Sequence, residues 1–111
     1  MTLKALVITS NVGVEHDELI QPLNYLNEKG IEAIHAAIKH AVVQTVKADK
    51  KVEAEVQPNA QLNSVNAEDY DVLVIPGGTV NADHLRIDED ALRLIQNFAD
   101  HQKPIAAICH G

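Results

Sequence analysis

The only cysteine of the chain, Cys109, stands in a local pattern that could do nucleophilic chemistry. It follows the short apolar run Ile105–Ile108, with Ala107 two positions before it and Gly111 two positions after it. Small residues at these positions are typical of a nucleophile on a tight strand-to-helix turn, where the backbone is crowded. A helix N-terminus favours the thiolate, and His110 adds an imidazole that can titrate near neutral pH. The alternative is a buried core cysteine.

Two further stretches carry residues that suit a site. Gly77 and Gly78 follow the apolar run Asp71–Ile75 after one proline, and glycines permit a positive φ and close backbone approach. Glu15 follows the first apolar run, and a partly buried carboxyl there could move a proton to or from a substrate. The plain alternatives are an ordinary turn for the glycines and a solvated loop carboxylate for Glu15. Because sites of parallel sheets lie at the carboxyl ends of strands, we expect these residues to meet Cys109 at one edge.

Three separated motifs together resemble the ThiJ/PfpI family. They are VEHDELIQP at Val14–Pro22, IPGG at Ile75–Gly78 and AICHG at Ala107–Gly111. The resemblance runs from Leu3 to Gly111 and is weakest from about Ala37 to Asn66. It implies a class I glutamine-amidotransferase-like fold that continues beyond the cysteine. The sequence is therefore expected to be the N-terminal part of such a domain, ending at the nucleophile turn.

The resemblance also implies roles for individual residues. Cys109 is the nucleophile, and Glu15 is the family acid that faces the thiol. The backbone N–H groups of Gly78 and His110 hold the oxyanion. In some relatives the histidine pairs with an acid of a neighbouring subunit, for which Asp83 is the nearest match. A dimer or higher homo-oligomer that needs no cofactor is therefore expected.

The first part of the chain predicts a right-handed βαβ unit and hence a parallel sheet. Leu3–Thr9 is expected to be a strand, and Ser10–Val14 a loop. A helix capped by Asp17 is expected to run to about Lys29, with Gly30 as its stop, before a second strand at Ile31–Ile38.

The next segment differs in pattern. Ala41–Val46 and Lys51–Val56 are rich in β-formers, and the alternation in the second run predicts a half-exposed antiparallel hairpin. Pro58 ends this hairpin, and the polar stretch to Asp69 is expected to be a loop with a short helical turn.

The last part of the chain predicts two further strands and one more helix. Asp71–Ile75 is expected to be a buried strand, Asn81–Arg86 a loop, and Asp88–His101 an amphipathic helix. Pro104 then starts a final buried strand, Ile105–Ile108. The predicted fold class is α/β, a flavodoxin-like, mostly parallel sheet with flanking helices and a β-hairpin insertion, as one partial domain over residues 1–111.

Composition narrows the function classes. The 111 residues carry a net charge of −7, which argues against nucleic-acid and anionic-membrane partners. No apolar run is long enough to span a bilayer, and a single cysteine favours the cytoplasm. The histidines show no paired spacing typical of a metal site, so no metal is expected; besides His110 they are His16, His35, His40, His84 and His101.

The favoured function is a cysteine-dependent enzyme acting on reactive carbonyls, as a glyoxalase or protein deglycase, or on peptides as an intracellular cysteine protease. A true glutamine amidotransferase is disfavoured. The alternatives are a non-enzymatic oxidative-stress sensor or chaperone-like protein, in which Glu15 stabilises oxidised Cys109, and a fragment that only folds or associates. Because the run Ile105–Ile108 is apolar on both faces and only two helices are predicted, a chain ending at Gly111 is expected to fold poorly and be inactive alone.

Overall fold

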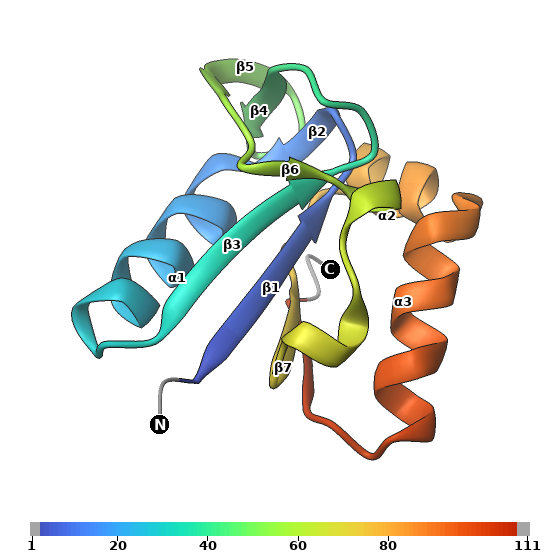
Figure 1. Cartoon of the computed structure of the whole chain (residues 1–111). Helices are drawn as coiled ribbons and strands as arrows, with labels where there is room; N and C mark the ends of the chain where they lie inside the picture. The colour runs from blue at the N-terminus through green and yellow to red at the C-terminus, as the bar shows by residue number, and fades with distance from the viewer. Residues whose placement is uncertain (1–2, 109–111) are drawn as a thin grey trace.

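A five-stranded parallel sheet forms the centre of the computed structural model, which describes residues 3–108 (Figure 1). The strand order is β6-β3-β1-β7-β8. Every neighbouring pair is parallel, so the predicted α/β class with a mostly parallel sheet is confirmed. The bounds are Lys4–Thr9 for β1, Glu32–Ala37 for β3, Ala60–Gln61 for β6, Val72–Ile75 for β7 and Ile105–Ala107 for β8.

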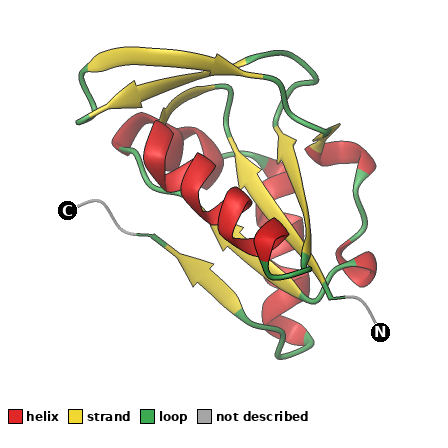
Figure 2. Cartoon of the chain, turned by 90° about the vertical axis from the view of Figure 1, so that its left-hand side faces the viewer, coloured by secondary structure: helices red, strands yellow, loops and turns green. Residues whose placement is uncertain are grey.

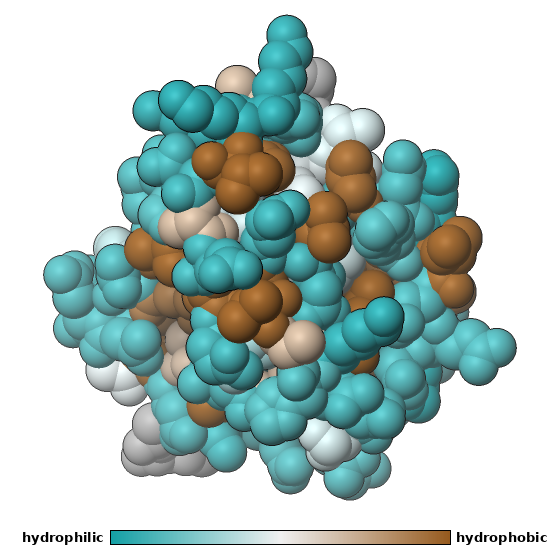
Figure 3. All heavy atoms as spheres, turned by 90° about the horizontal axis from the view of Figure 1, so that it is seen from above, coloured by the Kyte–Doolittle hydropathy of each residue, from teal (hydrophilic) through white to brown (hydrophobic). Residues whose placement is uncertain are grey.

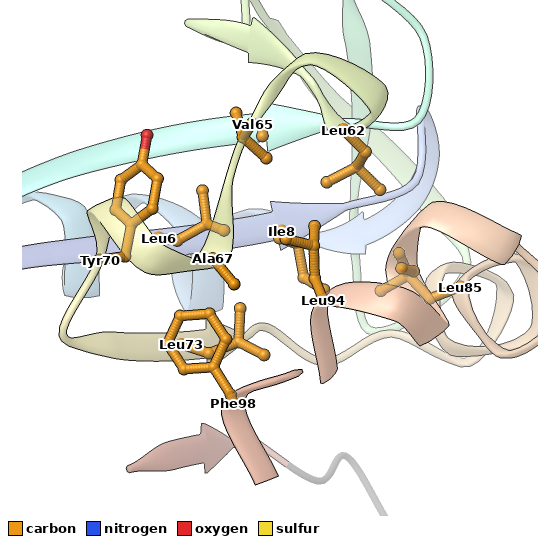
Figure 4. Close-up of a cluster of buried hydrophobic side chains, with 12 residues drawn as sticks. Leu6, Ile8, Leu62, Val65, Ala67, Tyr70, Leu73, Leu85, Leu94 and Phe98 are labelled. Atoms are coloured by element: carbon orange, nitrogen blue, oxygen red, sulfur yellow. The ribbon is translucent and has the colours of Figure 1, made fainter. Parts of the chain in front are cut away.

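Two helices cover opposite faces of this sheet. Helix α1 (His16–Glu28) packs Leu19 and Leu23 against one face, where β1 contributes Val7. Helix α3 (Glu89–Asp100) packs on the other face, where Leu94 and Phe98 lie over β1 and β7 (Figure 4). Alternate β1 residues therefore serve different cores, as expected for a strand buried on both sides. The Figure 4 cluster includes Leu6, Ile8, Leu62, Val65, Ala67, Tyr70, Leu73 and Leu85.

The helix ends largely follow the sequence signals. Asp88 caps α3 by accepting a hydrogen bond from the Ala91 N–H at 2.9 Å. Gly30 follows α1 with a φ of +77°, as expected of a helix stop. The predicted N-cap of α1 is wrong by two residues, because the N-cap is Glu15 rather than Asp17 and the helix begins at His16.

The predicted hairpin is present but belongs to a second sheet. Strands β4 (Val43–Lys47) and β5 (Lys51–Val56) pair in antiparallel fashion, as predicted. However, β4 also pairs in parallel with β2 (Val12–Glu15), which gives a three-stranded sheet in the order β2-β4-β5. The expectation of a loop over Ser10–Val14 is therefore wrong from Val12 onward. A strand this short is stabilised by its partner β4 rather than by its own sequence pattern.

Helix α2 (Thr79–Arg86) lies where a loop was expected. Its sequence holds Asn81, Asp83 and His84, which have low helix propensity, and it offers only two large apolar residues. Its stability comes from tertiary contacts: Asn81 is fully buried, and Leu85 packs into the α3 core. The polar stretch before β7 contains two short 3₁₀ turns, Leu62–Ser64 and Ala67–Asp69, in line with the expected helical turn.

Strand β8 forms one edge of the main sheet (Figure 2). The sequence predicts a buried strand, but Ile105, Ala106 and Ala107 are all exposed. The physical reason is position: within the described residues, β8 pairs with β7 alone. In residues 3–108, no helix is long and apolar enough to cross a membrane.

Candidate active site

The carboxyl ends of β2 and β7 meet at one edge of the fold, where the expected site lies. Glu15 is the last residue of β2, and its N–H donates to the Gly77 carbonyl oxygen at 3.1 Å. Strand β8 ends beside them, since the Ile108 N–H donates to the Ile75 carbonyl at 2.9 Å. The expected convergence is therefore confirmed for Glu15, Gly77 and Gly78. The predictions for Cys109 and His110 lie outside the described residues, directly after Ile108.

The loop Pro76–Gly78 is held at each of its three peptide groups. At the first, the Pro76 carbonyl accepts from Asn81 Nδ2 at 3.1 Å, and the Gly77 N–H donates to Glu18 Oε1 at 3.0 Å. At the second, the Gly77 carbonyl accepts from Glu15 N–H. At the third, the Gly78 carbonyl accepts from Ala82 N–H at 2.9 Å, and the next residue, Thr79, donates its N–H to Asp49. Such a loop has little freedom to rotate its peptide groups.

The Gly78 N–H is left available by this arrangement. A trans peptide points its C=O and N–H in opposite directions, so the carbonyl bond from Gly77 to Glu15 turns the Gly78 N–H away from β2. Gly78 is buried, and among the described residues its N–H has no hydrogen-bond acceptor. An oriented N–H without an acceptor is what an oxyanion site requires.

Glycine is required at both positions of this loop. Gly78 has a φ of +116°, and a Cβ placed there would overlap the Gly13 carbonyl oxygen. A Cβ on Gly77 would overlap Glu18 Oε1 and lie 2.9 Å from the Ile108 carbonyl oxygen. The same geometry shows that Glu18 and the end of β8 both border Gly77.

Glu15 is buried, with 7% of its surface exposed, and its carboxylate contacts the turn between β4 and β5. Its Oε2 accepts from the Ala48 N–H at 3.2 Å, and its Oε1 accepts from the Asp49 N–H at 2.6 Å. The solvated-carboxylate alternative is therefore wrong. The carboxylate that contacts the glycine loop, however, belongs to Glu18 in the first turn of α1.

Sequence reasoning missed two residues of this region, Glu18 and Asn81. Glu18 stands three residues after Glu15 at the start of a helix, so one helical turn separates the two carboxylates; this spacing is the signal that could have identified it. Asn81 is fully buried, and its Oδ1 accepts from both Ser10 N–H (2.7 Å) and Ser10 Oγ–H (3.0 Å). No local pattern marks it, because its partners are distant in sequence.

Asp83 lies on α2 rather than in a loop, and it pairs with Arg86 at 2.9 Å. It lines an open groove of about 350 Å³ that also borders Gly78, Ala107 and Ile108. The structure thus places Asp83 beside the candidate site of its own chain, and the expected role across a subunit interface stays a prediction. Among residues 3–108, no group of three or more His, Cys, Asp or Glu residues is placed to hold a metal ion.

Figure 3 shows the end of the molecule at which β1 and β3 finish. Apolar side chains form several patches there, surrounded by hydrophilic ones. The exposed large apolar residues of the elements around the site include Val12 of β2, Val42 just before β4 and Val80 of α2.

Comparison with known proteins agrees with this geometry. The model of the DJ-1/PfpI family matches residues 3–111. General stress protein 18 of Bacillus subtilis is 34% identical over 97% of this chain and 60% of its own length. A deglycase of Pyrococcus horikoshii is 33% identical over 98% of this chain and 61% of its own length. The crystal structure of Drosophila melanogaster DJ-1beta superimposes with a TM-score of 0.87 at 28% identity, covering 98% of this chain and 56% of that one. The chain thus spans about 60% of the length of these curated relatives.

Proposed function

The chain belongs to the DJ-1/PfpI family, and from this premise we propose that it carries the site of a cysteine-dependent enzyme acting on reactive carbonyls. The observation that carries the proposal is the Gly78 N–H, which is buried, fixed by the peptide bonds around it and without an acceptor among the described residues. It lies in the loop that borders Ile108, the residue before Cys109. The name of the Pyrococcus horikoshii relative, a deglycase, agrees with carbonyl chemistry.

The proposed first step is attack of the Cys109 thiolate on an aldehyde carbon. A C–S bond forms, and the π electrons of the carbonyl move to its oxygen. The Gly78 N–H, together with that of His110, stabilises this charge. Protonation of the oxygen gives a hemithioacetal.

For a dicarbonyl such as methylglyoxal, the proposed second step is a proton transfer between neighbouring carbons. A base takes the proton from the thiol-bearing carbon, and a proton returns at the adjacent carbon. This turns the hemithioacetal into a thioester, which water cleaves to a hydroxy acid and the free thiol. One substrate carbon is oxidised and the other reduced, so the reaction needs no cofactor, in line with the sequence-based expectation.

We assign the acid beside the thiol to Glu18 instead of Glu15. The Glu18 carboxylate contacts Gly77 and borders the end of β8, whereas the Glu15 carboxylate accepts hydrogen bonds from the β4–β5 turn. Glu18 then shares a proton with Cys109 or with the substrate, and His110 is the second candidate for moving the proton. A reducing compartment such as the cytoplasm would keep this thiol active.

A second candidate function is a sensor of oxidative stress. It is favoured by the name of the Bacillus subtilis relative, a general stress protein, and by the Glu18 carboxyl at the end of β8, which could donate a hydrogen bond to oxidised Cys109. The sensor would be oxidised once per cycle, whereas the enzyme turns over many substrate molecules.

The test uses the protein expressed from its complete natural gene. Methylglyoxal and a glycated peptide are supplied in excess, and hydroxy acid and released free amine are measured. We expect multiple turnovers that Cys109→Ser abolishes and Glu28→Gln, at the exposed far end of α1, leaves unchanged. Oxidation of Cys109 by peroxide without any turnover would support the sensor instead. Cleavage of casein without carbonyl turnover would support a function as a cysteine protease instead.

A further inference from the structure

The turn between β4 and β5 connects the second sheet to the candidate site. Three residues lie between the paired Lys47 and Lys51. The first two, Ala48 and Asp49, have φ values of +57° and +61°, and the Lys50 N–H donates to the Lys47 carbonyl at 3.2 Å, which closes a tight turn. Their N–H groups point to the buried Glu15 carboxylate. The turn is thereby fixed at the end of β2.

The Asp49 side chain continues from this turn to helix α2. Its Oδ1 accepts the Thr79 N–H at 2.9 Å, and its Oδ2 accepts the Thr79 hydroxyl at 3.0 Å. Thr79 is the first residue of α2 and directly follows Gly78. A carboxylate at this place also suits the positive end of the helix dipole.

These bonds control the peptide group that links Gly78 to Thr79. The Thr79 N–H points to Asp49, and the carbonyl of the same peptide accepts from Ala82. The preceding peptide is held by Glu15 N–H. With both flanking peptide planes fixed, the φ and ψ of Gly78 are fixed too, although a glycine would otherwise sample many values.

We propose that Asp49 is a positioning residue for the oxyanion site: it fixes the start of α2, and through it the direction of the Gly78 N–H. Glu15 acts one step further away, because it holds the Asp49 backbone. This inference rests on the proposed function, in which the Gly78 N–H stabilises the charge on the substrate oxygen. It assigns a role to the hairpin, although the hairpin lies in the part of the chain where the family resemblance is weakest.

The principal variant is Asp49→Gly, in the protein expressed from its complete natural gene. Glycine accepts the positive φ of this position, so the turn is kept while both bonds to Thr79 are lost. Thr79→Ala removes only the hydroxyl bond, and Asp49→Asn retains an acceptor for the Thr79 N–H. Ala48→Gly is the matched control, since it changes the neighbouring turn residue without altering any side-chain hydrogen bond.

Two rates are compared for each variant: turnover of methylglyoxal and alkylation of Cys109 by iodoacetamide. Alkylation needs the thiolate but develops no oxyanion. We expect Asp49→Gly to lower kcat and kcat/KM together by about 10- to 100-fold with KM unchanged. The kcat of Thr79→Ala should lie between those of Asp49→Gly and wild type, and the kcat of Asp49→Asn should be close to that of wild type. The alkylation rate should be the same in all variants.

Equal turnover in Asp49→Gly and wild type would overturn the proposal. A parallel loss of alkylation and turnover would also overturn it, because the defect would then be a general one. If the wild-type protein shows no carbonyl turnover, the proposed function fails, and amide hydrogen exchange over residues 77–82 decides the positioning role by itself. Exchange there should be faster in Asp49→Gly than in Ala48→Gly or wild type, and unchanged exchange would contradict the proposal.

Discussion

At the scale of single residues, Gly78 occupies a position that leaves no room for a side chain. Its φ of +116° disfavours any side chain, and a Cβ would overlap the Gly13 carbonyl. We expect Gly78→Ala to lower the free energy of unfolding by about 1–3 kcal/mol from backbone strain, plus the cost of the overlap. Gly30→Ala is the matched control, because its φ is also positive (+77°) but nothing lies within 4 Å of an added Cβ. Urea unfolding measures the free energy of unfolding of both variants. If both lose the same amount relative to wild type, the close approach of Gly78 to Gly13 contributes nothing to the cost.

His35 makes stability depend on pH. It lies in β3 with 2% of its surface exposed, its Nε2 is 2.8 Å from Thr9 Oγ1, and its Nδ1 has no partner among the described residues. Burial lowers the pKa of His35 from 6.5 to about 4. Below pH 6.5, His35 therefore binds a proton in the unfolded chain, whereas in the folded chain it binds one only near pH 4.

The stability contributed by neutral His35 is thus complete above pH 6.5 and is lost as the pH falls toward 4, by on the order of 3 kcal/mol. Urea unfolding of wild type and His35→Gln over this range isolates the effect, because the variant lacks only this titrating group. Parallel stability curves for the two proteins would show that His35 does not bear on acid stability.

At the scale of elements, the buried polar side chain of Asn81 connects α2 to the rest of the fold. Asn81 links the end of β1 to the loop after β7 through bonds to Ser10 and Pro76. Asn81→Ala removes the partner of the Ser10 N–H and of the Pro76 carbonyl, whereas the Ser10 hydroxyl still donates to the Val12 carbonyl at 2.7 Å. We therefore expect a loss of about 1–3 kcal/mol for each of the two groups that water does not reach. His84→Ala, exposed on the same helix, should change stability by less than about 0.5 kcal/mol. If both variants unfold at the same urea concentration, the bonds of Asn81 do not hold α2.

The elements differ in how far sequence alone could predict them. The strongly periodic α1 and α3, the apolar β1 and β7 and the alternating hairpin were predictable, because their stabilising contacts follow one local pattern. Helix α2 and strand β2 were not, since Asn81 and the pairing of β2 with β4 stabilise them from a distance. The IPGG motif located the glycine loop, but the VEHDELIQP motif could not distinguish Glu18 from Glu15, because the two carboxylates differ only in contacts made with distant parts of the chain.

At the scale of the whole molecule, we expect self-association into a dimer or higher oligomer. Val12 of β2, Val42 directly before β4 and Val80 of α2 are exposed, and apolar patches are visible on this end in Figure 3. The charge of −7 disfavours association unless such apolar contacts offset it. Light scattering on the natural protein measures its oligomeric state. A strict monomer with full activity would show that Asp83 of a neighbouring subunit has no role.

If Glu18 is the acid that shares a proton with Cys109, as we propose, the pH dependence of Cys109 alkylation depends on Glu18. Iodoacetamide reaction is followed from pH 5 to 10 in wild type, Glu18→Leu and Glu28→Leu, whose substitution lies at the exposed far end of the same helix. We predict a wild-type midpoint well below about 8.5, the usual cysteine value. Loss of the shared proton in Glu18→Leu should raise this midpoint by about one pH unit or more, while Glu28→Leu should match wild type. A wild-type midpoint near 8.5, or a Glu18→Leu midpoint that is unchanged or lower, would contradict the assignment of Glu18 as the acid beside Cys109.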